Sequence, residues 1–152
     1  MKKGNFRAIL CAVMCLVMSC FSLSQAAAEE IRETNYATVG ENLVWTTTSV
    51  HYELNEFDMP TDTLVVKGYF VNYSNKYINY FYDLNLIVTV TKKDSNEEAR
   101  INAVFKNFEA SIEPRSVKNH TFRIENAQVL YPIGKAGTLQ GHMKWKQSDA
   151  AG

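Results

Sequence analysis

Residues 64–93, LVVKGYFVNYSNKYINYFYDLNLIVTVTKK, decide the fold. Two runs rich in β-branched and aromatic residues flank the polar segment 72–76. Such runs favour strands, and the Asn and Ser side chains between them bond locally to the backbone and favour a turn. The stretch therefore predicts an antiparallel β-hairpin. It indicates an architecture, and it carries no recognisable chemistry.

Side chains in each run are expected to alternate between two faces, because successive strand residues point to opposite sides of a sheet. In the first run Val66, Gly68 and Phe70 are predicted to face a core, and Tyr69 to face solvent. Gly68 predicts a bulge or a close approach of backbones. In the second run the even-numbered positions are predicted to face the core. The predicted core set is Tyr80, Tyr82, Leu84, Leu86, Val88 and Val90, and the predicted outward set includes Phe81, Asp83 and Asn85.

The N-terminus has the pattern of a bacterial Sec signal peptide, predicted to span residues 1–28. A basic start is followed by the apolar stretch 8–23 and by small residues that offer an A-x-A cleavage site, so Glu29 is the predicted first residue of the mature protein. The expected location is periplasmic, cell-surface or extracellular. Segment 17–20 also loosely resembles a lipobox, so lipidation at Cys20 is the alternative, and only that would attach the protein to a membrane.

Removal of the signal peptide has two chemical consequences. All three cysteines, Cys11, Cys15 and Cys20, lie within it, so the mature chain is predicted to have no disulfide and no thiol chemistry. The full chain carries 16 basic and 16 acidic residues, and the loss of three basic residues leaves a net charge of about −3. A nucleic-acid partner, which would require a clustered basic surface, is not expected.

The remaining chain is predicted to form one all-β domain, at residues 43–147, between a flexible leader (29–42) and a frayed tail (148–152). About seven short strands separated by turn signals predict an antiparallel sandwich. Two points stay open. Trp45 has the opposite parity to Val50, Tyr52 and Leu54, which requires either a bulge or an exposed Trp45, and residues 97–108 could form a helix. The other expectations are a bulge or a short crossover after Lys106, a short edge strand within 126–132, and a last strand with Leu139, Gly141, Met143 and Trp145 inward.

Part of the chain resembles a known family of domains. The matching phrases are residues 65–74, Tyr77-Ile78, residues 84–90, Ile112-Glu113-Pro114 and Phe122-Arg123-Ile124. Together they resemble bacterial secreted immunoglobulin-like domains of the FxLYD type, over residues 63–125. The resemblance implies an immunoglobulin-like sandwich at the cell envelope without known catalytic residues. Segment 91–94 lacks the family's F-x-L-Y-D wording.

Enzymatic and metal-binding signals are weak. The chain has three histidines, His51, His120 and His142, and no hydrolase elbow, zinc-protease or phosphate-loop motif. Acidic clusters occur at residues 53–62 and 94–98, but neither has the spacing of a calcium loop, so both are interpreted as solvated turns. We therefore expect no enzyme activity, no metal and no cofactor.

An aromatic cluster within residues 69–82 is the strongest candidate for binding. Tyr73 and Tyr77 lie in the predicted turn, and Tyr69 and Phe81 have the outward parity. Exposed aromatic rings favour protein interfaces and sugar stacking, and they also form cross-strand pairs that only stabilise a sheet. The predicted function is a secreted or cell-envelope module that binds an unknown protein partner. The alternative is a glycan or small-ligand binding domain that uses Tyr73, Tyr77 and Tyr69.

Overall fold

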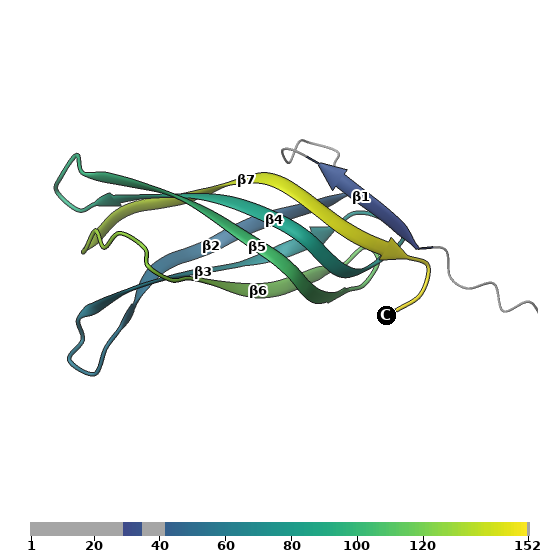
Figure 1. Cartoon of the computed structure of the whole chain (residues 1–152), viewed down its shortest axis with the longest axis horizontal. Coiled ribbons are helices and arrows are strands. Elements are labelled where there is room, and N and C mark those ends of the chain that lie inside the picture. Colours follow the sequence, from purple (N-terminus) through teal and green to yellow (C-terminus); the bar gives the residue numbers. More distant parts are fainter. Residues whose placement is uncertain (1–28, 35–41, 152) are drawn as a thin grey trace, which may run out of the picture.

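A computed structural model describes residues 29–34 and 42–151 (Figure 1). The predicted signal peptide, the lipobox-like Cys20 and most of the predicted leader lie outside these residues. The described chain forms two antiparallel sheets, with strand orders β1-β7-β4-β5 and β2-β3-β6. The strands are β1 (Glu30–Thr34), β2 (Leu43–Leu54), β3 (Pro60–Asn72), β4 (Tyr77–Lys92), β5 (Glu98–Ile112), β6 (Val117–Ile124) and β7 (Ile133–Ser148). The predicted all-β sandwich is confirmed.

The order of the strands can be compared with that of the immunoglobulin sandwich. That fold has strands A, B, E and D in one sheet and C, F and G in the other, to which the variable type adds C′ and C″. Here β2, β3 and β6 take the places of A, B and E, while β5, β4 and β7 take those of C′, C and F. The place of the last strand, G, is taken by β1 from the N-terminus, which pairs antiparallel with β7.

The ends of the predicted elements differ from the structure in three places. Residues 30–34 form the strand β1 and are not part of a flexible leader. The described chain has no strand at 126–132, although one was expected there. The predicted frayed tail also begins too early, because Ser148 belongs to β7 and is only 3% exposed. The sandwich therefore gains an edge strand where propensity alone indicated loose chain.

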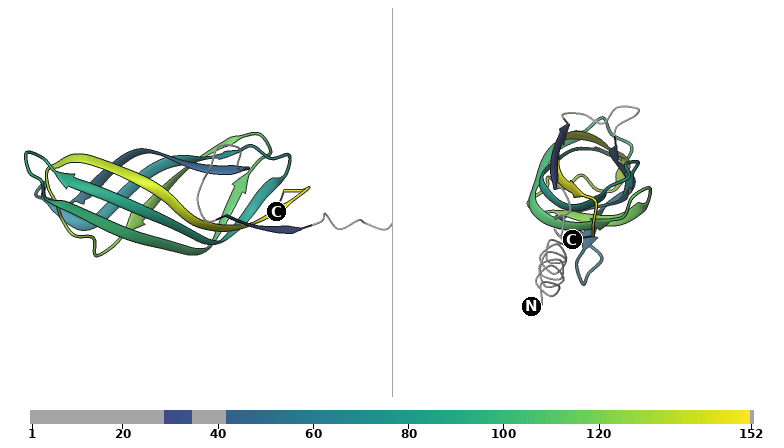
Figure 2. Two further views of the ribbon diagram at one scale, coloured as in Figure 1. Left: turned by 90° about the horizontal axis from the view of Figure 1, so that it is seen from above. Right: turned by 90° about the vertical axis from the view of Figure 1, so that its right-hand side faces the viewer.

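The core is largely aromatic, and it joins the two sheets. Trp45 of β2 lies edge-on to Phe70 of β3 and to Phe122 of β6, with ring centroids 4.9 and 5.0 Å apart. Phe70 in turn stacks on Phe81 of β4 at 4.9 Å. Such pairs add to the free energy gained by burying the rings. The right-hand view of Figure 2, along the long axis, shows the strands of the two sheets arranged around a common interior.

An extra residue in β4 explains the main error in the predicted faces. Phe81 lies opposite Trp145 of β7, yet Asp83 lies opposite the very next residue of β7, Lys144, so Tyr82 is a bulge. The inward parity is therefore odd at Phe81 and even from Leu84 onward, and a second irregularity between Ile78 and Tyr80 makes it even again at Ile78. Phe81 is completely buried, and the prediction that it faces solvent is wrong. Tyr80 and Tyr82, predicted to be core, are only partly buried.

The neighbouring strand β5 carries a matching irregularity. Phe105 and Phe108, three residues apart, both pack against the core, so the inward parity changes between them as expected. Asn107, between them, has a φ of 54°, a left-handed conformation that Asn tolerates better than most residues. Residues 97–108 are accordingly not helical. The predicted change of parity after Lys106 is confirmed, and it occurs within one continuous strand, so there is no crossover.

Two further irregularities determine the faces on which the side chains of Trp45 and Leu139 lie. A register shift between Thr47 and Ser49 of β2 brings Trp45 inward, where it is 6% exposed. In β7, Leu84 and Leu86 of β4 lie opposite Met143 and Gln140, so β7 has an extra residue. The Gln140 side chain is therefore buried, whereas Leu139 faces solvent and is 54% exposed. The predictions that Leu139 and Leu54 face the core are wrong, since Leu54 is 47% exposed.

We expect His120 to make stability depend on pH. Its ring centroid lies 4.4 Å from that of Phe122 and 5.6 Å from that of Phe108, and burial lowers its pKa below the ordinary value of 6.5. The unfolded chain then binds the proton more readily than the folded one, so stability falls as the pH drops below about 6.5. Thermal unfolding between pH 7.5 and 5 should show a smaller loss of Tm for His120→Phe than for the unsubstituted protein. Equal losses in both, with the exposed His51→Gln as control, would contradict this role.

Candidate interaction surface

The three tyrosines predicted as a binding platform do not come together. Tyr69 lies on the outer face of the β2-β3-β6 sheet, between Thr46 and Asn119. Tyr77 begins β4 in the other sheet, and Tyr73 lies in the connecting turn, 52% exposed. Within the described residues, no ring contact joins any two of them. With Phe81 buried, the predicted aromatic set does not form one surface.

The turn that carries Tyr73 is organised by a buried asparagine. Asn72 is 1% exposed, and its amide nitrogen donates to the carbonyl oxygens of Lys76 (2.8 Å) and Glu113 (2.9 Å). Its amide oxygen accepts from the Ser74 backbone N–H (3.0 Å) and hydroxyl (2.7 Å). Every hydrogen-bonding position of this amide that the turn can use is therefore filled. The segment Asn72-Tyr73-Ser74 forms a turn, as its polar residues predict, and the Asn72 amide is not accessible at the surface.

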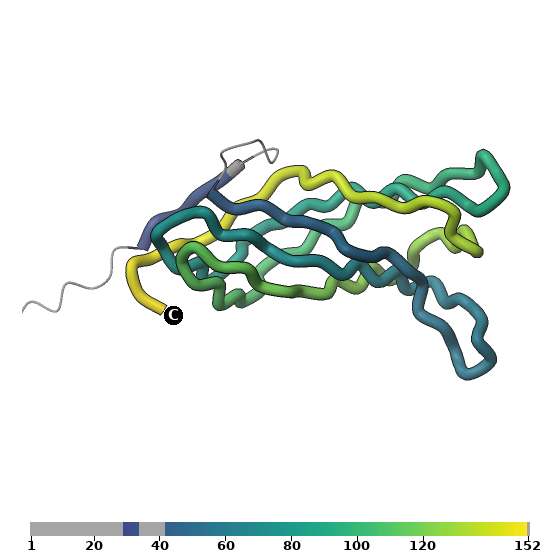
Figure 3. The backbone as a smooth tube through the Cα atoms, turned by 180° about the vertical axis from the view of Figure 1, so that it is seen from behind, coloured from purple at the N-terminus to yellow at the C-terminus, as the bar shows by residue number. Residues whose placement is uncertain are grey.

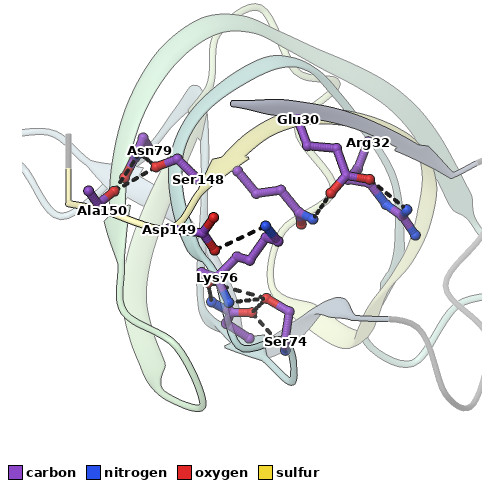
Figure 4. Close-up of polar contacts among 10 residues, drawn as sticks. Glu30, Arg32, Ser74, Lys76, Asn79, Ser148, Asp149 and Ala150 are labelled. Atoms are coloured by element: carbon purple, nitrogen blue, oxygen red, sulfur yellow. Dashed lines mark hydrogen bonds and ion pairs between the residues drawn. The ribbon is translucent and has the colours of Figure 1, made fainter. Parts of the chain in front are cut away.

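Polar contacts also close the same end of the sandwich (Figure 4). Lys76 donates to the Asp149 carboxylate at 3.0 Å, and the Asn79 amide donates to the Ser148 hydroxyl at 2.7 Å. The Ser148 hydroxyl donates in turn to the carbonyl oxygen of Ala150, at 2.6 Å. These bonds hold the C-terminal residues against β4. This end is a structural closure whose polar groups are engaged with one another.

A shallow groove lies on the outer face of the four-stranded sheet. Tyr80 and Tyr82 form its floor with ring centroids 5.1 Å apart in an edge-on arrangement. Polar side chains from three strands complete its lining: Asn79, Glu109, Ser111 and Lys146. The sequence placed both tyrosines in the core, and the bulge at Tyr82 is the feature that simple alternation could not indicate. Because Lys146 forms an ion pair with Glu29 at 2.6 Å, part of the polar lining is already paired.

Large apolar side chains are exposed close together at the tip of the β2–β3 hairpin. Phe57 is 74% exposed and Met59 59%, and both lie on the loop between β2 and β3, while Leu54, the last residue of β2, is 47% exposed. This loop projects beyond the sandwich at the end opposite the C-terminus (Figures 1 and 3). We call Leu54, Phe57 and Met59 the hairpin tip. A shallow groove lined by Val50, Leu54, Tyr131 and Ile133, among others, lies at its base.

The loop at the hairpin tip has a fixed backbone. The side-chain oxygen of Asn55 accepts from the backbone N–H groups of Phe57 (2.9 Å) and Met59 (3.0 Å). The backbone N–H of Asn55 donates to the Met59 carbonyl at 2.9 Å, and Asp58 takes a φ of 58° to complete the turn. Asn and Asp side chains favour such local bonds and such backbone angles. The two apolar side chains are therefore held outward by an ordered loop, which lowers the entropic cost of binding through them.

Carboxylates surround the hairpin tip. Glu56, Asp58 and Asp62 are exposed and are not paired with a cation within the described residues. Glu53, at the base, instead forms a two-bond ion pair with Arg123 of β6, and this contact lowers the pKa of Glu53. The exposed part of the hairpin is thus apolar with a negative rim. The sequence predicted only a solvated turn at residues 53–62. The presence of two large apolar residues, Phe57 and Met59, within this turn was the signal that could have revealed the hairpin tip.

Other kinds of site find no support in the described residues. No group of three or more His, Cys, Asp and Glu side chains is arranged there to hold a metal ion. Nor does this part of the chain contain a helix long and apolar enough to cross a membrane. No protein-family model, curated protein or solved structure matches the chain.

Proposed function

We propose that this protein is a non-enzymatic protein-interaction module, exported to the cell envelope or beyond, and that it binds its partner through the hairpin tip. The observation that carries the proposal is the exposure of Phe57 and Met59 on an ordered loop. Apolar side chains that are exposed together, and especially aromatic ones, commonly mark protein interfaces. Val104 and Val117 are also exposed, but each lies singly on its own strand.

The negative rim defines the chemistry of the partner. Glu56, Asp58 and Asp62 would be repelled by a surface rich in anionic lipids, which attracts basic segments instead. The complementary surface is an apolar pocket with lysine or arginine side chains at its edge. A protein partner of this kind would bury Phe57 and Met59 and pair the carboxylates around them.

The position of the tip suits this role. The described chain begins at β1 and ends beyond β7 at one end of the molecule, and the hairpin tip lies at the other (Figure 1). A protein held at its N-terminal end would therefore present the tip away from the point of attachment. This arrangement supports the proposal whether or not Cys20 is lipidated.

Replacing Phe57 and Met59 together with serine is expected to abolish partner binding and leave the fold intact. Binding energy at protein interfaces is concentrated in a few buried anchors, so we expect at least a tenfold loss of the retained partner, roughly 1.4 kcal/mol. The measurement is affinity capture from the organism's own envelope fraction, with bound proteins quantified by mass spectrometry. The Tm should change little, because both side chains are exposed.

Val117→Ser provides the matched control. Val117 is 60% exposed at the start of β6, so the substitution removes a similar apolar group from a different surface. A bound protein that is lost with the tip variant and kept with Val117→Ser supports the proposal. The same set of bound proteins with all three forms would remove the hairpin tip from the interface.

A further inference from the structure

β1 occupies a place in the fold that normally belongs to the other end of the chain. It pairs with β7 from Glu30 opposite Gln147 to Thr34 opposite Met143, where the immunoglobulin sandwich has its last strand. β2 contacts the rest of the same edge of β7. The Trp45 backbone N–H donates to the Gln140 side chain at 2.8 Å, and the hydroxyls of Thr47 and Thr138 are 2.6 Å apart.

β1 adds almost nothing to the hydrophobic core. Its one large apolar side chain, Ile31, is 58% exposed, and no described side chain of β1 is buried. The edge of β7 beneath it is part of the core, since Met143 and Trp145 are 0% and 2% exposed. The described side chains of β1 are thus not part of the buried core, and what β1 supplies is the backbone pairing of the β7 edge.

Charge holds β1 in register. Glu29 pairs with Lys146 at 2.6 Å, and Glu33 lies 3.4 Å from His142 and 4.0 Å from Lys144. The Gln147 amide donates to Glu30 at 2.8 Å. An acidic strand thus lies along a basic edge, and these contacts are independent of the covalent connection between β1 and β2. Any chain that carries the same segment can make them.

We propose that the β7 edge is a strand-acceptor site and that it also takes β1 from a second copy of this protein. Each copy then gives its N-terminal strand to the other, in the manner of a domain swap. Identical contacts form in the exchanged and the closed molecule, so concentration decides between them. Because β1 and β7 belong to one chain, the closed molecule holds its own strand at an effective concentration on the order of millimolar. Exchange is therefore expected where copies are crowded, or when they refold together. This goes beyond the proposed function, because it uses the opposite end of the molecule and a different partner.

The predicted absence of cysteine from the exported protein allows a direct test. Ile31 and Lys146 lie opposite each other in register, and Cα atoms of such pairs are roughly 4.5–5.5 Å apart, within reach of a disulfide. One protein carries Ile31→Cys and the other, with a tag of different mass, carries Lys146→Cys. The two are unfolded together, refolded at about millimolar concentration, where tethered and free strands compete, and oxidised.

A disulfide between the two chains is expected, read as the mixed species on a non-reducing gel. The matched control replaces Lys146→Cys with Leu139→Cys, because Leu139 is 54% exposed on the same strand but outside the paired segment. We expect about tenfold more mixed dimer in register than with this control, since only exchange brings the first pair together. Equal yields would mean that the disulfides form by collision, and strand exchange would be rejected. A double variant with both substitutions, oxidised at low concentration, should stay monomeric through a disulfide within one chain.

Discussion

Gly68→Ala is expected to lower the free energy of unfolding by more than about 4 kcal/mol, the range reserved for severe core defects. A Cβ atom at this position would overlap the carbonyl oxygen of Thr46. It would also lie 2.5 Å from Cζ2 and 2.9 Å from Cη2 of the Trp45 ring. Neither group can move freely, because the carbonyl belongs to the paired β2 strand and the indole is packed against Phe70 and Phe122.

The measurement is equilibrium unfolding in urea, followed by tryptophan fluorescence. Gly137→Ala is the matched control, since a Cβ there would meet no atom within 4 Å, and its effect should stay within about 0.5 kcal/mol. Because a domain of this size has a total stability of about 5–15 kcal/mol, the Gly68 variant should be partly unfolded at 37 °C. A midpoint close to that of the unsubstituted protein would show that Trp45 can repack.

The Gly68 site also shows how far the sequence could be interpreted. A glycine within a strand-like run predicts a bulge or a close approach, and the structure contains a close approach. The partner in that approach, Trp45, could not be identified, because its inward orientation depends on a register shift in a different strand. The sequence around a glycine can therefore show that another group comes close to it. Which group that is depends on the tertiary structure.

The same limit explains the errors in the candidate binding residues. Alternation predicted the faces of β4 correctly from Leu84 to Val90, where the strand is regular. It failed at Phe81, Tyr80 and Tyr82, because these residues lie between two register irregularities, one at Tyr82 and one between Ile78 and Tyr80, and the faces are inverted between them. Both aromatic and β-branched residues suit either face of a strand, so composition gave no sign of the inversion. The tyrosines with outward rings were consequently assigned to the core, and a core phenylalanine to the surface.

β1 was missed for a related reason. Its sequence, EIRET, has one aliphatic residue and three charges, which is weak as a strand signal. Its strand conformation comes from the open edge of β7 and from the basic side chains along that edge. The hairpin tip was missed because turn signals correctly predicted a loop but do not report which side chains the loop exposes.

Asn72→Ala is expected to destabilise the protein by about 3–5 kcal/mol, because it removes four hydrogen bonds from a buried position at once. The Asn72 amide connects the β3–β4 turn to the carbonyl oxygen of Glu113, in the turn between β5 and β6. Alanine would leave the carbonyl oxygens of Lys76 and Glu113 with one hydroxyl donor each, from Ser74 and Ser116. It would leave the Ser74 backbone N–H without its acceptor. Leaving buried polar groups unpaired costs more than the net gain from forming the bonds.

Two further variants separate this network from a general effect of shortening the side chain. Asn119→Ala makes the same change at an exposed asparagine and should alter the free energy of unfolding by no more than about 0.5 kcal/mol. Asn72→Asp keeps the shape and the acceptor oxygen but replaces both donors with a carboxylate that faces two carbonyl oxygens. At neutral pH it should destabilise at least as much as alanine, although it fills the same space. If Asn72→Asp were instead close to the unsubstituted protein, the turn would depend on packing, and the two donated bonds to Lys76 and Glu113 would contribute little.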